Sequence, residues 1–180
     1  MKMILCAFIL TGVFMGILSG QEKEGFTIST SSFQEAKTIP AKFAMKAVDG
    51  GQNISPELSW RNAPADTKTI AVTCIDIHPI AHKWVHWMVI NIPADSTGLP
   101  EGASPGKMPR NSRELKNSFG DEGYGGPQPP KGSGVHNYIF TVYALSEPIN
   151  TSGFISEDAF LKLISGKVLA KNQLTGTFSR

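Results

Sequence analysis

The sequence has little that would point to nucleic acid, to a disulfide framework or to several domains. Its 180 residues carry 17 basic and 15 acidic side chains, and a net charge of +2 gives no electrostatic reason to bind nucleic acid. Of its two cysteines, only Cys74 lies outside the N-terminal apolar run, so we expect no internal disulfide and a buried, small hydrophobic role for Cys74. A chain of this length, 41% hydrophobic, has room for one well-buried core and is short for two ordinary domains.

The N-terminus has the layout of a signal peptide. Lys2 is followed by an apolar run over residues 3–18 and then by two small residues. We therefore predict a signal peptide at residues 1–20 and a single domain at residues 21–180, exported to the periplasm or the extracellular space, with no membrane span after cleavage. The alternative is an uncleaved anchor, because Leu18 is a poor residue near the cleavage site.

The sequence pattern predicts mainly β-strands. Alternating apolar residues and β-branched side chains predict strands at Phe26 to Thr30, Leu58 to Trp60, Thr69 to Asp76, Val85 to Ile92, Val135 to Leu145 and Leu174 to Phe178. Helical periodicity is found only near the C-terminus, from Ser156 to Lys171, where Phe160, Ile164 and Val168 recur every four residues and Ser156 is a good N-cap. This pattern predicts a mainly β (β-rich α+β) fold: a β-sandwich or two-sheet assembly with a peripheral helix.

A long loop separates the last strands from the earlier ones. Between Pro100 and Gly134 the composition shifts to Gly, Pro, Ser, Asn and charged residues. Loops of this length inside a compact domain are usually functional or disordered, and the aromatic residues Phe119 and Tyr124 favour an ordered loop that packs against the core.

The four histidines lie in two short stretches, and both stretches are candidates for a site. Strand alternation places His82, Trp84, His86, Met88 and Ile90 on one face, with Val85, Trp87 and Val89 on the other. His136 and Tyr138 share a face by the same rule, directly after the loop. Histidine and tyrosine can donate hydrogen bonds to an anionic ligand. Asp76 is placed to accept a hydrogen bond from a histidine ring or to hold a ligand's ammonium group.

At this point the motifs resemble a known family. From about Phe26 to Arg180 the chain is similar to phosphatidylethanolamine-binding proteins, in particular the bacterial and archaeal Raf-kinase-inhibitor-like branch. The matching pieces are Asn53-Ile54-Ser55-Pro56-Glu57-Leu58-Ser59-Trp60, the segment from Trp84 to Pro93, Asn117-Ser118-Phe119-Gly120, Tyr124-Gly125-Gly126-Pro127 with Pro129 and Pro130, the single residues Gly132, His136, Tyr138 and Phe140, and Leu174-Thr175-Gly176-Thr177.

The resemblance implies a large antiparallel sheet packed on a smaller one and a small pocket for phosphate-type anions or phospholipid head groups. It implies a binding protein that is not an enzyme and needs no cofactor, with a role as inhibitor or modulator of an unidentified protein partner. The implied ligand-binding residues are Asp76, His86, Gly126, Pro127, His136 and Tyr138, and the candidate rim residues are His78, Ser55, Pro56 and Tyr124.

One departure from the family pattern concerns the pocket rim. The family usually has Asp-Pro-Asp-Ala-Pro where this chain has Asp76-Ile77-His78-Pro79-Ile80. Replacing a carboxylate by an imidazole should reduce the electrostatic repulsion of anions, so His78 is expected to alter ligand choice.

Three other hypotheses come from different classes of protein. A metal-dependent hydrolase would use His78, His82 and His86, but in a strand that spacing stretches the outer pair to roughly 26 Å, beyond the reach of one metal ion. A serine hydrolase would need an activated Ser55, yet the chain has no Gly-x-Ser-x-Gly elbow. An interaction protein without a ligand would use the long loop only as a display surface.

Overall fold

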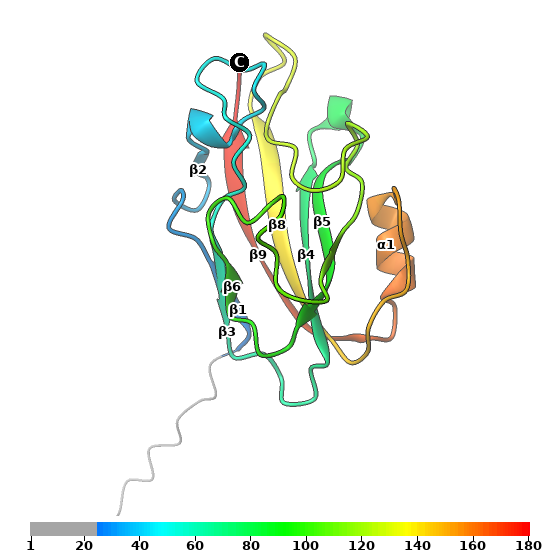
Figure 1. Ribbon diagram of the computed structural model, residues 1–180. Coiled ribbons are helices and arrows are strands. Elements are labelled where there is room, and N and C mark those ends of the chain that lie inside the picture. Colours follow the sequence, from blue (N-terminus) through cyan, green and yellow to red (C-terminus); the bar gives the residue numbers. More distant parts are fainter. Residues whose placement is uncertain (1–24) are drawn as a thin grey trace, which may run out of the picture.

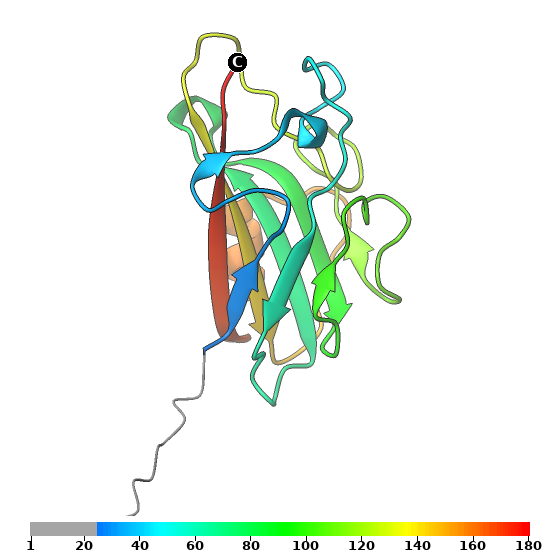
Figure 2. The same cartoon turned by 90° about the vertical axis from the view of Figure 1, so that its left-hand side faces the viewer.

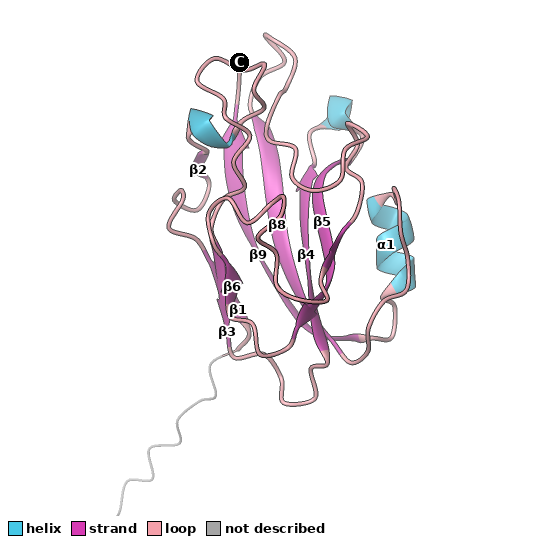
Figure 3. Cartoon of the chain, viewed as in Figure 1, coloured by secondary structure: helices cyan, strands magenta, loops and turns pink. Residues whose placement is uncertain are grey.

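The computed structural model describes residues 25–180, which form two β-sheets with one short α-helix (Figures 1 and 3). The predicted signal peptide, residues 1–20, lies outside the described residues. The strands are β1 (Thr27–Ser29), β2 (Lys37–Thr38), β3 (Leu58–Arg61), β4 (Thr69–Asp76), β5 (Trp84–Pro93), β6 (Gly98–Leu99), β7 (Arg113–Glu114), β8 (His136–Leu145) and β9 (Val168–Phe178). The helix is α1 (Glu157–Leu163), and the short 3-10 turns are η1 (Ala41–Phe43) and η2 (Pro79–Ala81).

The larger sheet has six strands in the order β2-β9-β8-β4-β5-β7, and the smaller has three in the order β1-β3-β6. All pairings are antiparallel except the short parallel pair β2 with β9. The predicted mainly β, two-sheet fold class is therefore confirmed.

The large sheet is buried on both faces. The small sheet covers one face and α1 packs on the other, as the two views in Figures 1 and 2 show. The inter-sheet core includes Trp60, Val72, Trp87, Phe140 and Val142. The helix-side core includes Ala71, Ile75, Met88, Tyr143 and Phe160. This double burial explains why β4 has no exposed position along its length.

Cys74 lies in that buried strand. It is a free thiol, 1% exposed. Burial and then the charge of Asp76 raise its pKa well above the ordinary value, so it behaves as the inert hydrophobic residue that the sequence predicts.

The predicted C-terminal helix is too long. Ser156 caps it as expected, because its Oγ accepts a hydrogen bond from the Ala159 N–H at 3.2 Å. The helix ends at Leu163, and Gly166 then adopts a left-handed conformation with φ of 77°. The segment from Val168 onward pairs with β8 instead, so the last strand begins six residues earlier than the predicted start at Leu174.

The predicted alternation in β5 is also wrong, because two β-bulges interrupt this strand. Register shifts occur between Ile70 and Val72 and between Cys74 and Ile75 of β4. At the second shift, Cys74 pairs with Trp87 and Ile75 with Val85, so His86 is the extra residue. A bulge re-aims its side chain. His86 therefore does not share a face with Met88, which lies in the helix-side core.

The long loop is ordered and packed, as its aromatic residues predict. The Tyr124 hydroxyl donates to the Phe43 carbonyl at 3.0 Å, and the Gly126 N–H donates to Asn53 Oδ1 at 2.7 Å. A Cβ on Gly126 would lie 2.0 Å from the Phe43 carbonyl oxygen. Only glycine permits this close approach of the loop to η1.

Candidate functional site

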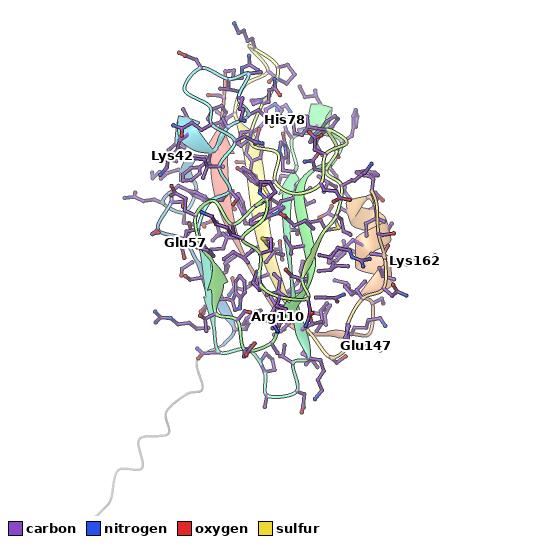
Figure 4. The ribbon with its side chains drawn as sticks, in the orientation of Figure 1. Lys42, Glu57, His78, Arg110, Glu147 and Lys162 are labelled. Atoms are coloured by element: carbon purple, nitrogen blue, oxygen red, sulfur yellow. The ribbon has the colours of Figure 1, made fainter. Side chains whose placement is uncertain are left out.

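The candidate site lies at one end of the large sheet, where four neighbouring strands begin or end. Asp76 is the last residue of β4, His136 the first of β8, and Arg180 follows the end of β9. Because neighbouring strands are antiparallel, these residues meet at the same end of the sheet. Asp76 pairs with both Tyr138 and Trp84 on the neighbouring strands. This is the upper end in Figure 1, and the labelled His78 lies at the same end in Figure 4.

A pocket of about 400 Å³ opens at this end of the sheet, and its volume suits a small molecule. Its polar lining comes from Asp76, His86, Gln128, His136, Tyr138 and Arg180. Its apolar lining comes from Ile80, Ala81, Trp84, Phe119, Pro129 and Pro130. The pocket thus combines a polar base with a largely apolar and aromatic wall.

Asp76 and His136 form a buried pair in this wall. The His136 Nδ1–H donates to Asp76 Oδ2 at 2.6 Å, and both side chains are almost inaccessible to solvent. Asp76 Oδ1 accepts from the His78 N–H at 2.9 Å. His136 Nε2 lies 3.0 Å from Ser133 Oγ. Both ring nitrogens of His136 therefore have protein partners, which fixes the ring against the pocket.

His86 is held by the long loop. Its Nδ1–H donates to the Gly125 carbonyl at 2.6 Å, and the Gly125 N–H donates back to the His86 carbonyl at 2.8 Å. The ring packs edge-on against Tyr138 and Phe119. Burial lowers the pKa of His86 to about 4, against smaller opposing contributions from the Gly125 carbonyl and the Asp76 charge, so the imidazole is neutral at physiological pH.

Tyr138 carries a buried hydroxyl without a well-formed hydrogen bond. The side chain is 0% exposed, and its hydroxyl makes no well-formed hydrogen bond with any of the described residues, although the Asp76 carboxylate acts on it as a weak acceptor. Burial and then the charge of Asp76 raise its pKa well above the ordinary value. The hydroxyl therefore keeps its proton, and the Tyr138 side chain is one of those that line the pocket.

The sequence-predicted residues are placed in two groups. Asp76, His86, His136 and Tyr138 all line the same pocket. Gly126 and Pro127 are not among its lining residues: the Gly126 N–H donates to Asn53 Oδ1, and the Pro127 carbonyl accepts from the Met45 N–H. The loop wall is formed by Gln128, Pro129 and Pro130.

None of the four candidate rim residues lines the pocket. His78 stacks on His136, with ring centroids 3.9 Å apart, and so lies behind that ring. Ser55 and Pro56 are buried before β3, where Ser55 Oγ accepts from the Ser104 N–H at 3.1 Å. Tyr124 packs edge-on against Trp87 in the inter-sheet core.

Eight of the twelve lining residues are absent from the predicted site, and Arg180, Trp84 and Phe119 are the most informative of them. Arg180 brings a guanidinium group to the pocket, and its Nη1 donates to the Pro129 carbonyl at 3.4 Å. Trp84 and Phe119 meet edge-on at 5.3 Å between ring centroids. The only sequence feature that pointed to Arg180 was the predicted strand ending at Phe178. If that strand pairs with β8, the residues that follow Phe178 lie beside His136.

The histidine cluster does not form a metal site. His78 stacks on His136, the exposed His82 ends η2 in a left-handed conformation with φ of 48°, and His86 is bonded to Gly125. Among residues 25–180, no three His, Cys, Asp or Glu side chains are grouped to bind a metal ion. No observation supports the hydrolase hypothesis.

Ser133, His136 and Asp76 form a hydrogen-bonded line that superficially resembles a catalytic triad. The Ser133 hydroxyl, however, also lies 2.7 Å from the Pro130 carbonyl, so this carbonyl and His136 Nε2 share its single proton. Ser133 does not line the pocket. Its position closes the turn that holds the loop over His136.

The geometry defines a class of protein: a two-sheet β protein with a small, partly apolar pocket built from two histidines, an aspartate and a tyrosine at the end of its large sheet. A family model described as phosphatidylethanolamine-binding protein matches residues 29–179. The chain therefore belongs to the phosphatidylethanolamine-binding protein family, and the resemblance seen in the sequence is confirmed.

The relatives come from several branches of microbes. A UPF0098 protein of Methanothermobacter thermautotrophicus is 37% identical over 154 residues, covering 85% of this chain and 98% of that protein. LppC of Mycobacterium tuberculosis, which carries the name of a lipoprotein, is 33% identical over 159 residues, covering 86% and 73%. The crystal structure of Escherichia coli YbcL, described as a member of the mammalian PEBP family, has a TM-score of 0.80 at 30% identity, covering 87% of this chain and 99% of that one.

Proposed function

We propose that this chain is an exported, non-catalytic binding protein whose pocket holds a phosphate-type anion, either free or as a phospholipid head group. The observation that carries the proposal is Tyr138, a pocket-lining residue whose buried hydroxyl has no well-formed hydrogen bond within residues 25–180. A buried donor without a partner costs free energy, and an anionic ligand would supply its acceptor. Arg180 adds a positive charge to the same pocket.

The apolar residues of the pocket support a ligand with an apolar part. Ile80 and Trp84 line the pocket and are 52% and 38% exposed. Single exposed apolar side chains are common, but apolar side chains gathered in one pocket favour contact with an apolar part of a ligand. They would contact the glycerol and acyl region of a lipid whose head group occupies the polar base.

Calorimetric titration with inorganic phosphate tests the binding function. Tyr138→Phe should weaken phosphate binding about tenfold, the effect of losing one hydrogen bond to a charged group. Tyr124→Phe is the matched control, because it removes a buried tyrosine hydroxyl from the same core without touching the pocket. Equal effects of the two changes would contradict the site assignment.

Two further measurements separate the ligand sources and the chemistry. Native mass spectrometry of protein from its own host would show a retained phospholipid or a free anion, and vesicles containing phosphatidylethanolamine should compete with phosphate only if the head group enters the pocket. Hydrolysis of a phosphate ester that survives repurification and stops with a chelator would instead favour the hydrolase hypothesis.

Export rests on the N-terminal pattern and is compatible with the lipoprotein name of LppC. Among residues 25–180, no helix is long and apolar enough to span a membrane. If residues 1–20 are a signal peptide, the intact mass of the native protein should lack roughly twenty N-terminal residues. Recovery of the full-length chain from the cytoplasm would contradict export.

A further inference from the structure

The hydrogen-bonding atoms that remain free in the pocket determine which anion it can hold. His136 uses both ring nitrogens within the protein, one on Asp76 and one on Ser133. It therefore offers a ligand the face or edge of its ring and no free N–H. The Asp76 carboxylate is 3% exposed and keeps only acceptor capacity beyond its two internal bonds.

His86 offers an acceptor and not a donor. A carbonyl oxygen can only accept, so the 2.6 Å contact with Gly125 places the ring proton on Nδ1. The reciprocal bond from the Gly125 N–H keeps the loop and the strand in this register. Nε2 of the neutral ring then carries a lone pair, and it is the ring nitrogen left for a ligand.

The donors are Tyr138 and Arg180. The Tyr138 hydroxyl is unpartnered, and Arg180 brings a permanent positive charge. Gln128 can present either its amide N–H or its carbonyl oxygen, so it does not decide between ligands. The pocket thus combines donors from β8 and from beyond β9 with acceptors from β4 and β5.

From this arrangement we propose that the pocket selects a phosphate group that still carries one proton, such as a phosphomonoester monoanion, over an anion without an acidic proton, such as a sulfate ester or a phosphodiester. The inference rests on the proposed function and narrows it to free phosphate and to head groups that end in a phosphomonoester. The P–OH group would donate to His86 Nε2 or Asp76, and the unprotonated oxygens would accept from Tyr138 and Arg180. An oxygen without a proton would instead face two acceptors, one of them charged.

The second ionisation of the phosphate should weaken binding for the same reason. A dianion loses the donated hydrogen bond and brings another negative charge close to the Asp76 carboxylate, which is largely shielded from water. The Arg180 charge attracts both forms, so it favours anions in general without providing the selection. The preference for one proton therefore comes from β4 and β5.

Phenyl phosphate and phenyl sulfate test this selection with matched charge and shape. At pH 5 a phosphomonoester is mainly a monoanion, because its second pKa is about 6, and phenyl sulfate is a monoanion without a proton. Calorimetry should give at least about tenfold tighter binding of phenyl phosphate, the effect of one charge-assisted hydrogen bond. At pH 8 this advantage should fall about tenfold, with phenyl sulfate reporting any contribution from other titrating groups.

Two variants assign the effect to atoms. His86→Ala should bring the two affinities at pH 5 to within about threefold, because it removes the ring acceptor. Tyr138→Phe should weaken both ligands about equally and preserve their ratio, since both accept from its hydroxyl. Far-ultraviolet circular dichroism and thermal melts establish that each variant is folded, and the wild-type comparison needs no variant.

The outcomes separate the inference from the proposed function. Equal affinities for the two ligands in the wild-type protein, or a preference for phenyl sulfate, would overturn the selection and leave an anion-binding pocket. Failure of both ligands and of inorganic phosphate to bind would overturn the proposed function itself. An undiminished preference in folded His86→Ala would show that the ring nitrogen of His86 is not the acceptor.

Discussion

Buried polar groups occur in two regions of the inter-sheet layer, and the two regions treat them differently. Outside the pocket, the Tyr124 hydroxyl donates to the Phe43 carbonyl at 3.0 Å and the Trp60 indole N–H donates to the Ser96 carbonyl at 2.6 Å. In the pocket wall, the Tyr138 hydroxyl has no well-formed hydrogen bond among the described residues. The bonds made by Tyr124 and Trp60 stabilise the fold, whereas the Tyr138 hydroxyl retains unused hydrogen-bonding capacity.

The largest expected effect comes from the one pocket group that also supports the fold. Asp76→Ala should lower the free energy of unfolding by about 3–5 kcal/mol, because His136 Nδ1 and the His78 N–H both lose their acceptor. Urea unfolding measures the change. Asp76→Asn is the control, since its amide oxygen can still accept one of these bonds and the loss should be smaller. A loss below about 1 kcal/mol for Asp76→Ala would show that the buried pair contributes little.

Acid should destabilise the pocket end through His86. The pKa of this residue falls from 6.5 to about 4 on folding, so the unfolded chain binds the proton more readily. Stability from this residue is complete above pH 6.5 and is lost as the pH falls toward 4, by roughly 3 kcal/mol in total. Comparing unfolding of wild type and His86→Gln across this range isolates the effect. Parallel pH profiles would mean that His86 is not held neutral in the folded protein.

The two buried tyrosines give the sharpest test of the comparison. Without ligand, Tyr124→Phe should lower the free energy of unfolding by about 1 kcal/mol, because it removes a made hydrogen bond. Tyr138→Phe should leave it unchanged or raise it by up to about 1 kcal/mol, because it removes an unmade one. At this chain length, 1 kcal/mol corresponds to roughly 2–4 °C in Tm. A similar loss in both variants would show that Tyr138 has an internal partner.

The smallest expected effect belongs to His78, which lies behind the pocket wall. His78→Asp should weaken binding of inorganic phosphate by less than about 1 kcal/mol relative to His78→Asn, because the added carboxylate lies one ring away from the ligand. Both variants lose the stacking on His136, so their difference isolates the charge. Equal affinities at low salt would show that His78 acts only as a turn residue before η2.

Local pattern was sufficient where a strand is buried on both sides or a cap is strong. The predicted range of β4 agrees with the structure at both ends, and Ser156 caps α1 as expected. The helix end was wrong because an apolar residue every four positions fits a helix as well as a strand over short stretches. Pairing with β8 draws Val168 into the sheet, and tertiary hydrogen bonds override the weaker local preference.

The sequence identified four polar pocket residues, because strand alternation and the family motifs both single them out. It missed Arg180, which lies in no motif, and it assigned no pocket role to Trp84 and Phe119, although both lie in segments that match the family. It also misjudged the face of His86, because a β-bulge depends on how β5 registers against β4 and leaves no reliable mark in a single strand.

By itself the sequence determined the fold class and the family and predicted four of the residues that line the pocket, since these follow from hydrophobic pattern and short motifs. The tertiary structure decided which atoms of those residues remain free. His86 is bonded to a carbonyl 39 residues away, and His136 to a carboxylate 60 residues away. Such contacts fix the proton on Nδ1 of each ring; Nε2 of His86 is then left for a ligand, whereas Nε2 of His136 lies beside Ser133 Oγ. Strand pattern and motif do not encode that choice.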